Sequence, residues 1–96
     1  MTKLYDKVAE NFLELASFQR LNILYKLLER SRKRIEPLAK ELGATKQEIH
    51  RNLARLEQSG LIARNKVGRY YLTTFGRTIC VQIPSIVYLS EHREYF

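Results

Sequence analysis

Residues 44–62 read ATKQEIHRNLARLEQSGLI, and this stretch decides the fold. Thr45 followed three residues later by Glu48 is a capping box, in which a hydroxyl and a carboxylate satisfy backbone donors at the start of a helix. Gly60 supplies the left-handed residue that commonly follows the end of a helix. The pattern predicts a helix over residues 46–59, and its core-facing side carries Ile49, Leu53 and Leu56.

Three further helices are predicted before this stretch. Apolar residues recur at steps of three and four in residues 1–16 and again in a second helix that Ser17 can cap. A short third helix runs from residue 35 to residue 42 with Pro37 in its first turn, and Gly43 ends it. The third helix, the tight turn after it and the helix over 46–59 together predict a helix-turn-helix.

A two-stranded hairpin, or wing, is predicted after the helix-turn-helix. Residues 61–64 and 70–73 are short β-prone runs, and Gly68 lies in the loop between them. Thr74 can cap a fifth helix, which Pro84 should kink or break. The expected fold is mainly α with a small β-hairpin, a winged helix-turn-helix with extra N- and C-terminal helices in a single domain over residues 1–96.

The charge of the chain favours a nucleic-acid partner. The net charge is +7, and the excess lies in residues 26–40, with six positive and two negative side chains, and in residues 45–77, with seven and two. Apolar residues at 45% argue against disorder, and no apolar run approaches the length of a membrane span. The single cysteine, Cys80, cannot form an internal disulfide, which predicts a reducing compartment and a cytoplasmic protein.

The outer face of the helix over 46–59 has the side chains that read DNA. Gln47 and Arg51 lie one helical turn apart near its start, and they are the predicted base readers because Gln can bond adenine and Arg can bond guanine. Phosphates or flanking bases are the expected contacts of three further residues of this face: Lys46, His50 and Arg55. The alternative interpretation is an ordinary solvated face.

The wing adds a second basic group of residues. Over residues 64–70, Arg64, Lys66 and Arg69 surround the loop and can follow the DNA backbone or enter the minor groove. One of Tyr70 and Tyr71 should lie in the core, and the other is free to contact DNA. A further cluster, Arg32, Lys33 and Arg34, lies in a loop between helices, where solubility explains it as well as phosphate contact does.

Residues 44–62 resemble the recognition helix and first strand of ArsR-type winged-helix regulators, with the ending L-x-x-L-x-x-x-G-L-I as the most specific part. Residues 73–77 resemble a strand-to-helix junction common in archaeal members, where the domain often begins a longer regulator. The resemblance covers residues 17–83 and implies a dimeric DNA-binding regulator of transcription with a roughly palindromic operator. The metal-sensing branch has a Cys-x-Cys pair that residues 35–42 lack, and His50 stands where the family often has serine.

The apolar terminal segments predict a homodimer. Residues 1–16 and 84–96 flank the 17–83 core, and they are richer in apolar residues than a 96-residue monomer needs. We expect them to form the dimer contact, and the alternative is that they pack on their own chain. Cys80 is expected to be a buried small apolar residue, with a redox sensor or an intermolecular disulfide as the alternative.

Catalysis, cofactors and metals find no support in the sequence. There is no Ser/His/Asp arrangement with motif support and no phosphate-binding glycine loop, and His50 and His92 are too far apart to suggest a ligand pair. The chain is therefore predicted not to be an enzyme and to need no metal. Two alternatives to a sequence-specific regulator remain: an architectural DNA binder of low specificity, and a winged helix used for protein or RNA contacts.

Overall fold

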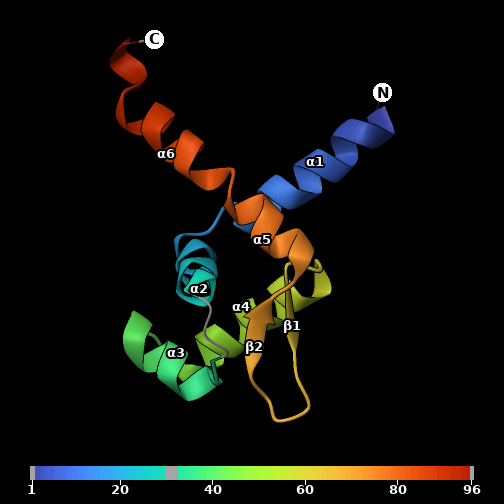
Figure 1. Cartoon of the computed structure of the whole chain (residues 1–96), viewed down its shortest axis with the longest axis vertical. Coiled ribbons are helices and arrows are strands. Elements are labelled where there is room, and N and C mark those ends of the chain that lie inside the picture. Colours follow the sequence, from blue (N-terminus) through green and yellow to red (C-terminus); the bar gives the residue numbers. More distant parts are fainter. Residues whose placement is uncertain (1, 30–32, 96) are drawn as a thin grey trace.

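The computed structural model describes residues 2–29 and 33–95, so Arg32 of the predicted basic cluster lies outside the described residues. The predicted fold class is confirmed: the structure is a mainly α winged helix-turn-helix with one antiparallel hairpin (Figure 1). Its elements in chain order are α1 (Thr2–Leu15), α2 (Phe18–Leu28), α3 (Ile35–Leu42), α4 (Lys46–Gln58), β1 (Ile62–Arg64), β2 (Tyr70–Leu72), α5 (Thr74–Cys80), α6 (Ile83–Glu91) and the 3-10 turn η1 (Arg93–Tyr95).

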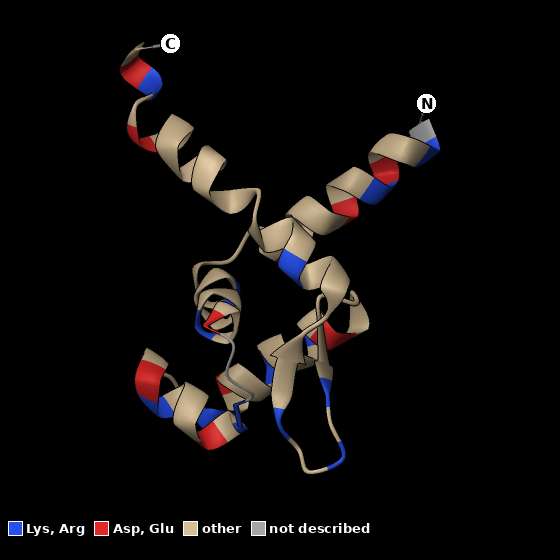
Figure 2. Cartoon of the chain, in the orientation of Figure 1, with Lys and Arg blue, Asp and Glu red and all other residues tan. Residues whose placement is uncertain are grey.

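The two terminal helices point away from the wing and the helix-turn-helix. In Figure 1, α1 and α6 diverge from the body at one end, and the wing loop and α3 lie at the opposite end. Figure 2 shows Lys and Arg on both arms of the wing and none on α6, whereas α1 has both basic and acidic residues. None of the helices in the described part of the chain is long and apolar enough to cross a bilayer.

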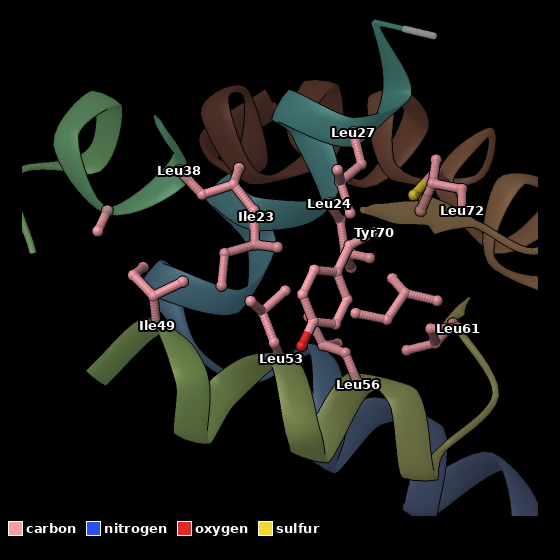
Figure 3. Packing of buried hydrophobic residues seen from close by; sticks show 13 residues of the cluster. Ile23, Leu24, Leu27, Leu38, Ile49, Leu53, Leu56, Leu61, Tyr70 and Leu72 are labelled. Carbon is pink, nitrogen blue, oxygen red and sulfur yellow. The ribbon is translucent and has the colours of Figure 1, made fainter. Parts of the chain in front are cut away.

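The core is built around α2, which contacts α1, α3, α4, α5 and β2. Several buried side chains face one another in Figure 3. Nine large side chains are completely or almost completely buried: Ile23, Leu24, Leu27, Leu38, Ile49, Leu53, Leu56, Leu61 and Ile62. Burying one such side chain contributes roughly 1.5 to 3 kcal/mol. The three residues predicted to form the inner side of α4 are all in this group, which fixes its other side toward solvent.

The capping box at the start of α4 is formed as predicted. The Glu48 N–H donates to Thr45 Oγ1 at 3.1 Å, and the Glu48 carboxylate accepts from the Thr45 N–H at 3.2 Å and from its hydroxyl at 2.8 Å. These bonds from Thr45, the hydroxyl first, lower the pKa of Glu48. At the other end Gly60 has φ +82°, as the helix end requires.

Thr45→Ala should destabilise the protein by about 0.5 to 2 kcal/mol, since it removes an N-cap. Because the pKa of Glu48 is lowered on folding, its part of the box stabilises the fold above the unfolded glutamate value of about 4.3 and is lost as the pH falls through the lowered pKa. Urea unfolding at pH 7 and pH 3 measures both effects. Thr45→Ser keeps the cap and should be neutral, and an equal cost for both variants would contradict this account.

The hairpin pairs β1 and β2 antiparallel, with Ala63 opposite Tyr71. A third segment, which the sequence did not predict, joins its free edge. Lys33 exchanges both backbone hydrogen bonds with Tyr70, at 3.0 and 2.7 Å. The loop before α3 is therefore tied to the wing.

The junction after β2 corrects one prediction. The N-cap of α5 is Thr73, not Thr74: its hydroxyl oxygen accepts from the Gly76 N–H at 2.9 Å and lies 2.6 Å from the carbonyl oxygen of Gly60. The predicted break near Pro84 is confirmed, because the chain turns after α5 and α6 starts at Ile83 with the proline in its first turn.

Candidate nucleic-acid interface

The first half of α4 presents polar side chains to solvent. Gln47, His50 and Arg51 are exposed and make no hydrogen bond or ion pair with any other described residue. Gln47 and Arg51 lie on the same side of the helix, one turn apart. Because these side chains are exposed, their hydrogen-bond donors and acceptors are available to a bound ligand such as the base edges of a nucleic acid.

Lys46 has a partner that sequence reasoning missed. Its ammonium lies 2.9 Å from a carboxylate oxygen of Glu36, in the first turn of α3. The hydrogen bond and the charge of Lys46 lower the pKa of Glu36. Both side chains are more than 60% exposed, and exposed pairs of this kind are weak. A phosphate could therefore replace Glu36 as the partner of Lys46 at small cost.

Arg55 differs from the other predicted site residues of α4. Its guanidinium makes two bonds to the Glu14 carboxylate of α1: Nε to Oε2 at 3.2 Å and Nη2 to Oε1 at 3.1 Å. The structure thus separates Arg55 from the free side chains at the start of the helix. No local pattern links residues 41 positions apart, so the sequence could not have indicated this pair.

The wing loop is a closed turn with exposed cations. The Asn65 side chain accepts hydrogen bonds from the N–H groups of Val67 and Arg69, at 3.1 and 2.9 Å, and Gly68 takes φ +82°. The three predicted wing contacts are exposed: Arg64, Lys66 and Arg69. The asparagine fixes the loop backbone, so these side chains project from a defined turn.

As predicted, one of the two wing tyrosines lies in the core, and it is Tyr70. Tyr70 is 5% exposed, and its ring points toward Leu53 and Leu56 of α4 (Figure 3). The Arg64 guanidinium lies 5.9 Å from the centre of that ring, within cation–π range. Tyr71 is partly buried on the other face of the hairpin.

The described part of the basic cluster joins the wing. Lys33 is paired with Glu41 at 3.2 Å. Arg34 is exposed, and a Cβ placed on Gly68 would lie 3.9 Å from its Nη1 atom, so this guanidinium is beside the wing loop. The charge run in the sequence left solubility and phosphate contact equally open, and only the fold places Arg34 next to the wing.

The described residues form neither a metal site nor a reactive cysteine site. Within residues 2–29 and 33–95, no group of three His, Cys, Asp or Glu side chains could hold a metal ion. Cys80 is buried as predicted, and burial raises the pKa of its thiol. A buried thiol with a raised pKa is a poor nucleophile at neutral pH.

Comparison with solved structures defines the class of protein. A homodimeric winged helix-turn-helix DNA-binding domain from Mycobacterium bovis is 26% identical over 99% of this chain and 89% of its own, with a TM-score of 0.74. An ArsR-like transcriptional regulator from Rhodococcus sp. RHA1 is 25% identical over 97% of this chain and 90% of its own, with a TM-score of 0.68. The transcriptional repressor BigR from Xylella fastidiosa has the same fold at 21% identity, covering 96% and 93%, with a TM-score of 0.74. The protein thus has the fold of ArsR-like winged helix-turn-helix regulators, as the resemblance implied.

The family follows from a second comparison. The family model described as the HVO_A0261 N-terminal domain matches residues 9–92, and the chain belongs to this family. No curated protein sequence matches this chain significantly. The relatives named above are described as regulators and DNA-binding domains rather than enzymes, in agreement with the prediction that this chain is not an enzyme.

Proposed function

We propose that this protein is a sequence-specific regulator of transcription that binds double-stranded DNA as a homodimer in the cytoplasm. One observation carries the proposal: the unpaired polar side chains of α4 and the cations of the wing are exposed, and the large exposed apolar side chains lie mainly on the terminal helices. In this arrangement the start of α4 enters the major groove and the wing follows the backbone or the minor groove.

The division of roles follows from geometry. Gln47 and Arg51 are the proposed base readers, because both are exposed and neither side chain makes a hydrogen bond or a close ion pair within the described residues. Phosphates are the proposed partners of His50 and of the other exposed cations of α4 and the wing. The residues of this group are Lys46, His50, Arg64, Lys66 and Arg69. Arg34 joins this group because of its place beside the wing loop.

The proposed dimer contact is formed by α1 and α6. Leu4, Tyr5, Val8 and Phe12 lie along one side of α1 and are 41 to 64% exposed in the single chain, and the four apolar side chains from Ile86 to Leu89 are also exposed. An apolar groove of about 530 Å3 between α2 and α5–α6 continues this surface. Exposed apolar surface of this extent marks an interaction site, and a second copy supplies a complementary surface under twofold symmetry.

Selection of bound sites from a random duplex library tests the proposal. We expect two half-sites whose centres are about 34 to 36 Å apart, one turn of DNA, and an affinity that falls steeply with salt. Recovery of bound duplexes without a shared motif would indicate an architectural binder instead. An absence of duplex binding at moderate salt would favour protein or RNA contacts.

Arg51→Ala should cost sequence discrimination. The variant should bind the selected site about 5- to 150-fold more weakly, which corresponds to the roughly 1 to 3 kcal/mol of a bidentate Arg–guanine contact, and should lose much less affinity for random duplex. Competition titrations with both duplexes measure the difference. Lys66→Ala is the matched comparison, since a phosphate contact should weaken both duplexes alike. Equal losses for Arg51→Ala would make Arg51 a phosphate contact.

A further inference from the structure

Arg20 is the one buried charged residue in the described part of the chain, at 6% exposure. It lies on α2, but the three hydrogen bonds of its guanidinium lead to two other helices. Nε donates to the carbonyl oxygen of Glu14 at 2.6 Å, and Nη2 donates to that of Leu13 at 3.1 Å. Nη1 donates to Asn52 Oδ1 of α4 at 3.0 Å. One guanidinium therefore caps the last turn of α1 and holds the middle of α4.

Glu14 makes a second link between the same two helices. Its carboxylate binds Arg55 of α4 through two hydrogen bonds and lies 3.9 Å from the Nε atom of Arg20. Burial and the charge of Arg55 lower the pKa of Arg20, and the charge of Glu14 raises it. The carboxylate thus lies between two cations that would otherwise repel each other, and its side chain is only 19% exposed.

The partners complete a closed network. The Asn52 amide nitrogen donates to Gln19 Oε1, which ties α4 to the start of α2 as well. A polar hollow of about 440 Å3 separates α1 from the last turns of α4, with Glu10, Gln58 and Ser59 among its lining residues. Beside this hollow, the bonds of Glu14 and Arg20 connect α1 to α4.

We propose that Glu14, Arg20, Asn52 and Arg55 form a coupling cluster that sets the angle of the recognition helix α4 from the position of the dimer helix α1. Arg55 is then a positioning residue, not a phosphate contact. This inference rests on the proposed function, because it assigns α4 to DNA and α1 to the dimer. It changes the expected role of Arg55 from a DNA contact to a residue that positions α4.

Two features separate Arg55 from the groove-facing residues. It lies in the second half of α4, whereas a recognition helix usually reads DNA with its N-terminal residues. A move toward phosphate would leave the little-exposed Glu14 carboxylate without its two bonds from Arg55. A charge with so little exposure loses stabilisation when its partner leaves, so the pair should survive DNA binding.

A double-mutant cycle on DNA affinity tests the proposal with the full chain and the selected duplex. Glu14→Gln and Arg55→Gln should each weaken binding about 3- to 30-fold, and the double variant should be no weaker than either alone, because all three lose the same coupling. The dependence of log affinity on log salt should keep its slope in Arg55→Gln. Lys66→Gln, a proposed phosphate contact, should lower that slope by about 0.9 and so calibrates the assay.

Opposite results would overturn the inference. If Arg55→Gln lowers the salt slope like Lys66→Gln, and Glu14→Gln tightens binding by freeing a cation, then Arg55 contacts phosphate and Glu14 competes with DNA for it. Additive losses in the double variant would show that the two residues act independently. Thermal unfolding of each variant verifies that all are folded at the assay temperature.

A DNA-free measurement distinguishes this inference from the proposed function. Failure of the unaltered chain to bind any duplex would refute the function. Amide hydrogen exchange would then still decide the cluster: Arg55→Gln on α4 should speed exchange in the last turn of α1, with no change in α3. Unchanged exchange in α1 would overturn the coupling whatever the DNA result.

Discussion

Replacing Phe12 by lysine should lower affinity for a duplex with two half-sites about 100- to 10,000-fold. Phe12 is 59% exposed in the single chain, and it lies on the α1 stripe that we propose as the dimer contact. A charge in that contact would separate the protomers, and each would then bind one half-site without the high effective concentration that linkage provides. The substitution raises the net charge, so electrostatic repulsion from DNA cannot cause the loss.

Asp6→Asn is the matched control for Phe12→Lys. It also raises the charge by one unit on α1, but residue 6 lies off the stripe formed by Tyr5, Val8 and Phe12. We expect it to leave the dimer intact and DNA affinity equal or slightly higher. Sedimentation and gel-shift titrations measure both properties. A Phe12→Lys variant that stays dimeric and binds normally would rule out this face as the dimer contact.

Gly76→Ala should unfold the junction between the wing and α5, at a cost of about 3 kcal/mol or more. A Cβ on this buried helical glycine would lie 1.9 Å from the carbonyl oxygen of Leu61 and 2.8 Å from its carbonyl carbon. Both are backbone atoms at the start of the hairpin, so a side-chain rotation cannot relieve the overlap. Overpacking of well-packed sites costs roughly 1 to 3 kcal/mol, and a collision with backbone belongs at or above that range.

The sign of the Gly76→Ala effect makes the test sharp. In an exposed helix the same change would stabilise the protein by about 1 kcal/mol, because alanine has the higher helix propensity. Arg77→Ala, at the next and exposed position of α5, should change stability by less than about 0.5 kcal/mol. Chemical denaturation compares the two. A neutral or stabilising Gly76→Ala would mean that α5 and β1 do not approach as closely as described.

Local sequence signals predicted the parts of the fold that depend on neighbouring residues. The capping box at Thr45 and Glu48, the apolar face of α4 and the glycine after it lie within one short stretch, and all are formed. The exposed face of α4 follows from them, because the burial of Ile49, Leu53 and Leu56 leaves only the solvent side for Gln47 and Arg51.

Long-range contacts were beyond the sequence. Arg20 and Asn52 are 32 positions apart, and nothing in either local pattern indicates that a buried guanidinium joins them. Thr73 and Thr74 are equally good N-caps by type. The fold selects Thr73, because its hydroxyl also reaches the Gly60 carbonyl oxygen across the junction.

The backbone bridge between Lys33 and Tyr70 limits how the protein can adapt to DNA sites of different shape, if it binds DNA as proposed. It joins the segment that leads into α3 to the inner strand of the wing, while the Tyr70 ring packs on α4. The wing, the segment before α3 and the α4 helix are thus held together as one stiff unit. In the proposed DNA-bound dimer, adjustment to the spacing or curvature of a site should then come from tilting each whole unit about the twofold axis, and hardly at all from bending the wing.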